Sequence, residues 1–239
     1  MNLNHPTRLF LIVLGALVAL LGACSSSESD EGDGAPDADQ ILEQAATTFE
    51  DTESAHFVLE IDGTIGIDEE GMLELGAVEG DIARPASAQA NADVNFAGSS
   101  VTMEMIAADG QMYLRNILTG DWERAPSDLQ YDPARIFDGE QGIGSIIAQL
   151  GELELVGEDS IDGTDAWHLT AVVDTPEVQA LAGNFFEGDQ LDIDIWVATE
   201  DHRLLQVELH DSAAEEPTSW ELSLSDHGEP VEITPPDLE

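Results

Sequence analysis

Polar and apolar residues alternate over much of the chain after residue 54, which is the period of a β-strand with one face in water. The longest case is residues 86–96, where four alanines, Val94 and Phe96 alternate with five polar residues. The same alternation returns in residues 55–61, 101–105, 167–173, 191–197, 205–209 and 220–224. Turn signals such as Ala108-Asp109-Gly110 and Asp162-Gly163 lie between these segments. A buried parallel sheet would give continuous apolar runs, so the pattern predicts antiparallel strands.

Three segments have a helical period instead. Asp37 is a candidate N-cap for a helix that ends near Glu50. Asp132-Pro133 opens a second segment, whose apolar stripe is Ile136, Phe137, Ile143, Ile146, Ile147 and Leu150, with Gly142 and Gly144 splitting it. Thr175-Pro176 opens a third, with Thr175 as N-cap and with Val178, Leu181 and Phe185 on one face. The pattern therefore predicts an α+β fold, in which short helices cover the apolar face of one large, curved antiparallel sheet.

The N-terminus has the features of a bacterial lipoprotein signal peptide. An apolar run, residues 9–21, is followed by Gly22-Ala23 and then by Cys24, the single cysteine of the chain. Residues 9–23 are fifteen in number, fewer than the ~20 that a permanent membrane-spanning helix needs. We predict that residues 1–23 are removed and that Cys24 is lipidated, for example with palmitate. The protein would then sit on the extracytoplasmic face of the cell membrane.

The segment after the cysteine lacks large apolar residues and is rich in acidic and small residues. Such a composition does not fold by itself, so we expect residues 24–39 to be the acylated cysteine and a flexible tether. Residues 40–239 would form one domain, since 239 − 23 = 216 residues are enough for one substantial core.

The charge balance excludes some partners. Without Arg8, 6 − 1 = 5 arginines face 51 acidic residues, and the chain has no lysine. This makes nucleic acid or an anionic lipid surface an implausible electrostatic partner. The acidity fits either a solvated shell suited to a salty environment or specific cation binding. We favour the shell, because the carboxylates are spread evenly and no calcium-loop motif occurs.

The sequence offers no catalytic, metal or cofactor site. It lacks His-Glu-x-x-His, Gly-x-Ser-x-Gly and phosphate-binding loops, and the histidines have no metal-ligand spacing. His168 alternates with Trp167 and Leu169, which predicts a solvent-facing side chain. Asp192 and Asp194 share a strand face and could be paired catalytic carboxylates, but they are better explained as the wet face of a strand. We predict that the protein is not an enzyme.

The order of several short motifs resembles the LppX/LprAFG lipoproteins of mycobacteria and related bacteria over essentially the whole mature domain. The motifs are Ser54-Ala55-His56-Phe57, Gln111-Met112-Tyr113-Leu114, Tyr131-Asp132-Pro133-Ala134, Gly142-Ile143-Gly144-Ser145, Ile195-Trp196-Val197 and Gly228-Glu229-Pro230-Val231-Glu232-Ile233-Thr234-Pro235-Pro236. The resemblance implies a half-barrel sheet wrapped around helices, as in periplasmic lipoprotein carriers, with an apolar cavity between the layers. It also implies that lipids or acylated glycolipids bind there and are carried through the cell envelope, with an envelope transporter as a possible partner. The chain departs from the family in its acidity, its lack of lysine and its longer tether, which puts the family's particular ligands in question.

From the residues alone, an apolar face of this kind is by default packed core. Two features strengthen the case for a cavity, and the resemblance makes the cavity the working hypothesis. Met103, Met105 and Met112 cluster on neighbouring strands, and methionine suits adaptable apolar surfaces. The alanines of residues 86–92 leave room where a packed core has larger side chains. The predicted wall residues are Phe57, Ala90, Val94, Phe96, Met103, Met105, Ile146 and Phe185.

The favoured function is thus a membrane-anchored lipid carrier without cofactors. The first alternative is a non-catalytic binding or sensor module that acts through its acidic outer surface, with an exposed Trp196. An envelope hydrolase is the second, and it is disfavoured because no nucleophile–base pair can be named.

Overall fold

The computed structural model describes residues 36–63, 65–66, 73–96, 98–126, 135–136, 142–147, 149–182, 185–212 and 217–238. Its helices and strands are α1 (Ala38–Asp51), β1 (Ser54–Asp62), β2 (Ile65–Gly66), β3 (Leu73–Ala83), β4 (Ser87–Phe96), β5 (Ser99–Ala108), β6 (Gln111–Arg115), β7 (Trp122–Arg124), α2 (Ile143–Ile147), β8 (Gly151–Ile161), β9 (Thr164–Asp174), α3 (Thr175–Ala182), β10 (Gln190–Ala198), β11 (Leu204–Asp211) and β12 (Thr218–Ser225).

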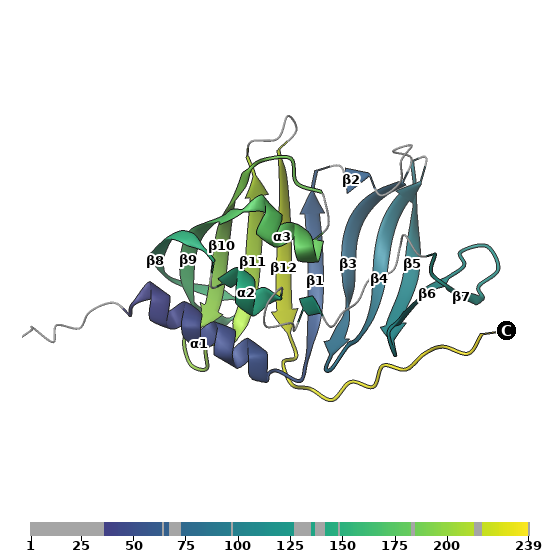
Figure 1. The fold of residues 1–239 in the computed structure, drawn as a ribbon, viewed down its shortest axis with the longest axis horizontal. Helices are drawn as coiled ribbons and strands as arrows, with labels where there is room; N and C mark the ends of the chain where they lie inside the picture. Colours follow the sequence, from purple (N-terminus) through teal and green to yellow (C-terminus); the bar gives the residue numbers. More distant parts are fainter. Residues whose placement is uncertain are drawn as a thin grey trace, which may run out of the picture. The chain divides into compact units, whose positions relative to one another are not determined.

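The strands form one 12-stranded antiparallel sheet in the order β7-β6-β5-β4-β3-β1-β12-β11-β10-β9-β8, with β2 paired to β3. The sheet is curved and open, so that β7 and β8 are its two edges, and the helices lie on its concave side (Figure 1). This confirms the predicted α+β half-barrel. Among the described residues, no helix is long and apolar enough to cross a membrane.

Helix α1 begins where the sequence predicts, because Oδ1 of the N-cap Asp37 accepts a hydrogen bond from the Asp39 backbone N–H at 3.0 Å. The helix therefore starts within the segment expected to be tether. Its buried residues, Ile41, Leu42, Ala45 and Phe49, pack against the inner face of β9 to β11. This packing forms the larger of the clusters that make up the core.

The tight turns follow the sequence signals. Asp109 and Gly110 both have positive φ (54° and 70°), as do Asp162 and Gly163 (49° and 83°). These are the conformations of two-residue turns whose twist matches that of paired strands. They fix the β5–β6 and β8–β9 hairpins.

The strand β3 was not predicted from alternation. Its pairing with β4 shifts register between Leu75 and Val78, so polar and apolar residues do not alternate regularly along it. Helix α2 is short, and residues 135–136 form a separate helical turn. The expected opening of that segment at Asp132-Pro133 lies outside the described residues, as does Phe137.

A further difference concerns β11. Alternation places Leu205 on the same face as Val207, but the pairing of β10 with β11 has a bulge, where Trp196 pairs with Gln206 and Val197 pairs with Leu204. Leu204 is therefore the inward residue, and Leu205 packs on the outer face against Trp196.

Candidate functional site: an apolar cavity under the sheet

A cavity of about 340 Å³ lies between the concave face of the sheet and helices α2 and α3. Its size falls within the range of small-molecule sites and far exceeds the ~30 Å³ share of one water molecule. All its lining residues are apolar or aromatic. Among the residues that the structure describes, none in the wall is a charged group, nucleophile or general base.

Small residues create the space on the sheet side. One row of directly paired inward residues crosses four strands as Phe57, Gly80, Ala90 and Met105. The next row runs Ile82, Ala88, Ala107 and Met112. Because the middle of each row carries only a hydrogen atom or a methyl group, a space remains above the centre of these strands.

Branched aliphatic residues close the cavity on the helix side. Ile143, Ile146 and Ile147 come from one face of α2, and Ile136 comes from the preceding helical turn. Val178 and Leu181 come from α3. Their spacing of three or four residues is the repeat of one helical face, which is why each short helix can present several wall residues.

The structure brings four of the eight predicted wall residues to the cavity: Phe57, Ala90, Met105 and Ile146. Val94 is buried at 3 % exposure but is not a lining residue, and neither is Met103. The side chain of Phe96 lies outside the described part. Phe185 is not in the wall: it is 36 % exposed just after α3.

Phe186 has the buried position that helical spacing assigns to Phe185. It is 5 % exposed and lies 4.9 Å from Trp220, centroid to centroid. The helix ends at Ala182, before Phe185, so the period of α3 does not extend to the phenylalanines. A helical face cannot be extrapolated beyond the last turn.

A buried carboxylate holds the loop that carries Phe186. Oδ2 of Asp211, a residue with 1 % exposure, accepts hydrogen bonds from the backbone N–H groups of Glu187 (2.7 Å) and Gly188 (3.0 Å). The Thr175 hydroxyl donates to the Gly188 carbonyl at 2.6 Å. Thr175 was expected to cap α3, and here its side chain instead fixes this loop to the start of the helix.

Sequence reasoning missed several wall residues, among them Trp220, Leu204 and Ala107. Trp220 and Leu222 were on the predicted inner face, but nothing in the alternation separates residues at a cavity from residues in packed core. Leu204 was missed because alternation assigned Leu205 to the inner face, and the bulge in the pairing of β10 with β11 reverses that assignment.

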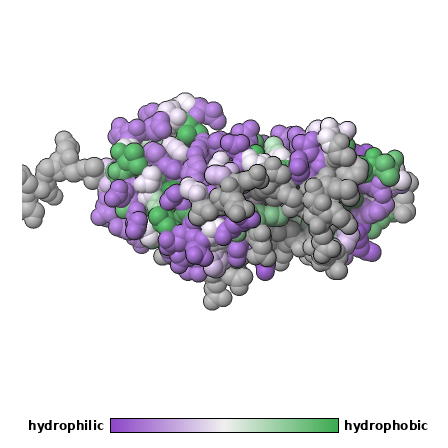
Figure 2. All heavy atoms as spheres, turned by 90° about the horizontal axis from the view of Figure 1, so that it is seen from above, coloured by the Kyte–Doolittle hydropathy of each residue, from purple (hydrophilic) through white to green (hydrophobic). Residues whose placement is uncertain are grey.

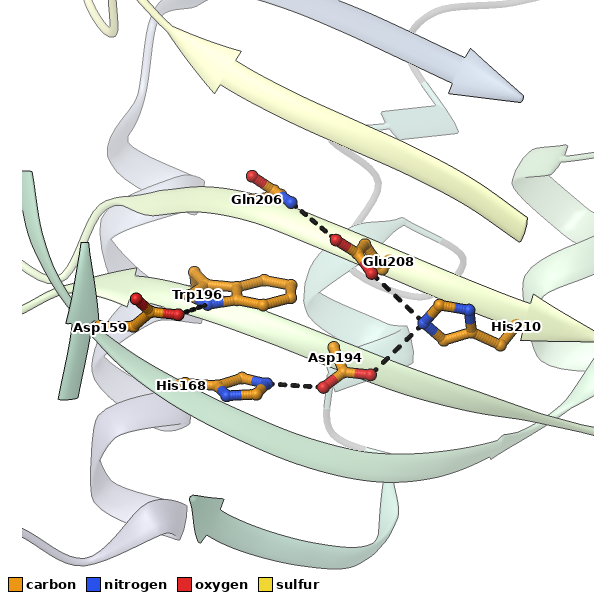
Figure 3. Close-up of polar contacts among 7 residues, drawn as sticks. All are labelled: Asp159, His168, Asp194, Trp196, Gln206, Glu208 and His210. Atoms are coloured by element: carbon orange, nitrogen blue, oxygen red, sulfur yellow. Dashed lines mark hydrogen bonds and ion pairs between the residues drawn. The ribbon is translucent and has the colours of Figure 1, made fainter. Parts of the chain in front are cut away.

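The outer face of the same strands carries a polar cluster (Figure 3). His168 stacks on Trp196 with ring centroids 4.5 Å apart, and its Nε2 lies 2.6 Å from Oδ1 of Asp194. Nε2 of His210 lies 3.4 Å from Oδ2 of Asp194 and 3.3 Å from Oε2 of Glu208. Within the described residues, no group of three or more His, Cys, Asp and Glu side chains is arranged to hold a metal ion.

One expectation about this face is wrong. Trp196 is only 8 % exposed, because it lies under His168 and its indole N–H donates to Oδ2 of Asp159 at 3.2 Å. The alternative of a sensor module with an exposed Trp196 therefore loses its proposed contact residue. His168 lies on the outer face, as alternation predicts, with its side chain 20 % exposed.

Four carboxylates form a row across the outer face, which we call the acidic row: Asp194, Glu208, Glu221 and Glu60. Each is paired directly with the next on β10, β11, β12 and β1. Like charges placed opposite each other on a sheet are destabilising. Partial burial, followed by the charges of Glu208 and Glu60, raises the pKa of Glu221 above its ordinary value of 4.5.

We predict that Glu221→Gln stabilises the protein at pH 7 by about 0.5 kcal/mol. A raised pKa means that the folded state favours the protonated carboxyl, so the ionised form costs stability above that pKa. The gain should vanish as the pH falls below the ordinary value of 4.5, where the carboxyl is protonated in both states. Denaturant unfolding at pH 7 and pH 3.5 measures both effects.

The exposed tail residue Glu232 provides the matched control for this charge change. Glu232→Gln removes the same charge but no member of the acidic row. An equal gain in stability for both variants would mean that the effect comes from the change in net charge alone.

The chain is similar to proteins of known families. The model of the LppX_LprAFG lipoprotein family matches residues 37–233. A curated relative from Mycolicibacterium hassiacum, named lipoarabinomannan carrier protein LprG, is 31 % identical over 96 % of this chain and 98 % of its own. The protein of the same name from Mycobacterium bovis (strain BCG / Pasteur 1173P2) is 26 % identical, over 98 % of this chain and 97 % of its own.

Two solved structures share the fold. LprF from Mycobacterium bovis aligns with a TM-score of 0.67 and 24 % identity, covering 86 % of this chain and 99 % of its own. LppX from Mycobacterium tuberculosis aligns with a TM-score of 0.62 and 15 % identity, covering 82 % and 98 %. At these sequence identities, the two structures show that the fold is shared and nothing more.

Proposed function

Since this chain belongs to the LppX_LprAFG lipoprotein family, we propose that it is a lipid carrier of the cell envelope, anchored to the membrane through Cys24. Lipids or acylated glycolipids bind with their acyl chains in the apolar cavity. The protein then shields these chains from water while the lipid is transferred, and no catalytic step is needed.

The observation that carries this proposal is the cavity itself. An apolar space of about 340 Å³ left unfilled costs a protein on the order of 8 kcal/mol, at about 24 cal/mol per Å³. That is comparable with the whole stability of a typical domain, about 5–15 kcal/mol. A bound apolar ligand recovers most of this cost, so a wall of small and branched residues favours a ligand site over a poorly packed core.

The chemistry of the wall matches an acyl chain. Burying a methylene group contributes about 0.8 kcal/mol, so about twenty methylene groups contribute about 16 kcal/mol. This exceeds most estimates of the cost of association, about 4–15 kcal/mol. Shape and apolar surface are therefore sufficient for binding.

The named relatives support the ligand class. Two curated homologues that align with nearly the whole chain are named lipoarabinomannan carrier proteins. The present chain carries a formal net charge of −45. An anionic head group outside the cavity would be repelled by that charge, which favours neutral or weakly charged head groups.

Native mass spectrometry of the full chain purified from its own host tests the proposal. We expect a bound mass that lipid extraction identifies as acyl-containing. Protein that is consistently empty, although its host membranes contain acyl lipids, would contradict the proposal.

Anchoring is tested by Cys24→Ser. The substitution removes the thiol that would carry the acyl chain, so we expect the protein to leave the membrane fraction and to lose the mass of the lipid modification. Ser25→Ala, one residue further on, should leave both unchanged. Membrane retention of the Cys24→Ser variant would show that another part of the chain holds the protein there.

A further inference from the structure

The turn between β6 and β7 presents two large aliphatic side chains to solvent. Leu118 is 91 % exposed and Ile117 is 59 % exposed. In the part of the chain that the structure describes, only five large hydrophobic residues are exposed, and these two are neighbours. In Figure 2, hydrophobic atoms are visible at the end of the molecule where Figure 1 has β6 and β7, as well as at the opposite end.

This tip (residues 116–121) is held rigidly by hydrogen bonds. Oδ1 of Asn116 accepts from the backbone N–H groups of Leu118 (2.9 Å) and Thr119 (3.2 Å). The Asn116 backbone N–H donates to the Asp121 carbonyl at 2.9 Å and its carbonyl accepts from Gly120 at 2.8 Å. Nε of Arg115 also donates to the Gly120 carbonyl at 3.0 Å. A flexible turn could fold its aliphatic side chains back onto the protein, whereas this one keeps them outward.

The charge around the tip differs from that of the rest of the molecule. Residues 110–120 contain no carboxylate, although the chain has 51 acidic residues. Arg115 and Arg124, two of the few arginines, lie on the strands that flank the tip. Glu104 pairs with Arg115 at 2.6 Å, and Glu123 accepts from the Asn116 amide at 2.9 Å, while the exposed Asp121 is the one carboxylate of the tip itself. The tip is therefore an apolar point with a single carboxylate, flanked by two arginines, on an acidic protein.

We propose that the β6–β7 tip is a membrane contact, at which Ile117 and Leu118 enter the outer surface of the lipid bilayer. An anionic bilayer repels most of this protein, so an apolar projection with little charge of its own is the place that can approach it. This assignment rests on the proposed function in one respect, because a lipid carrier must touch the bilayer that supplies its ligand.

The position of the tip in the sheet supports this contact. β6 and β7 form one edge of the sheet, and α1 contacts β8 at the opposite edge. The chain enters the domain at the N-terminal end of α1 (Figure 1). An acyl anchor at Cys24 would raise the local concentration of membrane around the tip.

Spin labelling of the full chain tests the contact. The acylated protein is reconstituted into vesicles of phosphatidylethanolamine and phosphatidylglycerol, with a nitroxide at Leu118→Cys. The control is Val156→Cys on β8, an aliphatic residue with the same 59 % exposure as Ile117 at the other edge of the sheet. Wild-type protein treated in the same way reports any label on Cys24.

We expect the label at position 118 to be accessible to oxygen dissolved in the bilayer and protected from a water-soluble nickel chelate, and the label at 156 to show the opposite. Equal access of the chelate to both labels would overturn the proposal. Protection of position 118 without vesicles would also overturn it, because a second copy would then be covering the tip.

A transfer assay separates this inference from the proposed function. Leu118→Asp should slow the uptake of a fluorescent acyl lipid from these vesicles about tenfold, with Val156→Asp unchanged. The amount of lipid bound at equilibrium should stay the same for both. If even the wild-type protein takes up no lipid, the carrier function fails, while the label at position 118 still decides whether the tip enters the bilayer.

Discussion

Replacing Ala90 with tryptophan should abolish lipid binding and leave the protein folded. Ala90 lies in the inward row between Gly80 and Met105, so an indole ring at this position projects into the cavity. If the ring displaces about five methylene groups, the loss is about 4 kcal/mol, or nearly a thousandfold in affinity. In a packed core, the same substitution would instead cost about 1–3 kcal/mol of stability through overpacking.

The matched control is Asn91→Trp, which adds a comparable side chain on the same strand but on the opposite, exposed face. Lipid content by native mass spectrometry and stability by denaturant unfolding should be measured for both variants. A large loss of stability in Ala90→Trp, with lipid still bound, would mean that the space is not the ligand site.

Replacing Gly80 with alanine should destabilise the whole sheet by about 3 kcal/mol. A Cβ atom at Gly80 would lie 2.7 Å from the Cα atom of Ala90 and closer still to the Gln89 carbonyl oxygen. Both are backbone atoms, so no side-chain rotation can relieve the overlap. β3 and β4 would have to separate in the middle of their pairing. Chemical denaturation should show a lower midpoint, or the protein should fail to accumulate.

Gly151→Ala is the control for the loss of glycine. Gly151 also lies in a strand, but a Cβ atom there would be 3.7 Å from the Val172 carbonyl oxygen, which is an ordinary van der Waals distance. Its effect should stay within about 0.5 kcal/mol. Similar losses at both positions would show that the close approach of β3 and β4 has no special cost.

The fold was predictable because each strand has one wet face. Where pairing is regular, as between β4 and β5 and between β9 and β10, alternation identifies the inward residues from the sequence alone. Where a bulge interrupts the pairing, alternation fails. Leu205 was assigned to the wrong face for this reason, and β3 was not predicted as a strand.

The cavity was predictable only in part. A row of alanines reduces the volume of side chains on a face, but the distance to the opposite layer decides whether the face packs or leaves a space. That distance depends on the positions of α2 and α3, which cannot be predicted from the alternation of polar and apolar residues. The alanines of β4 therefore indicated the region, whereas Ala107, Leu204 and Trp220 became wall residues only through the curvature and register of the sheet.

The open sheet has a consequence for self-association. The edge strand β8 has one row of backbone N–H and C=O groups without a neighbouring strand in the described part of the chain, and such edges invite pairing between copies. Along this edge lie the exposed carboxylates of Glu152, Glu154, Glu158 and Asp159, and its pairing with β9 is irregular at two places. A second copy that approached in register would bring these charges together. The acidity thus keeps one copy from adding its sheet to another, and acidification should promote aggregation through this edge.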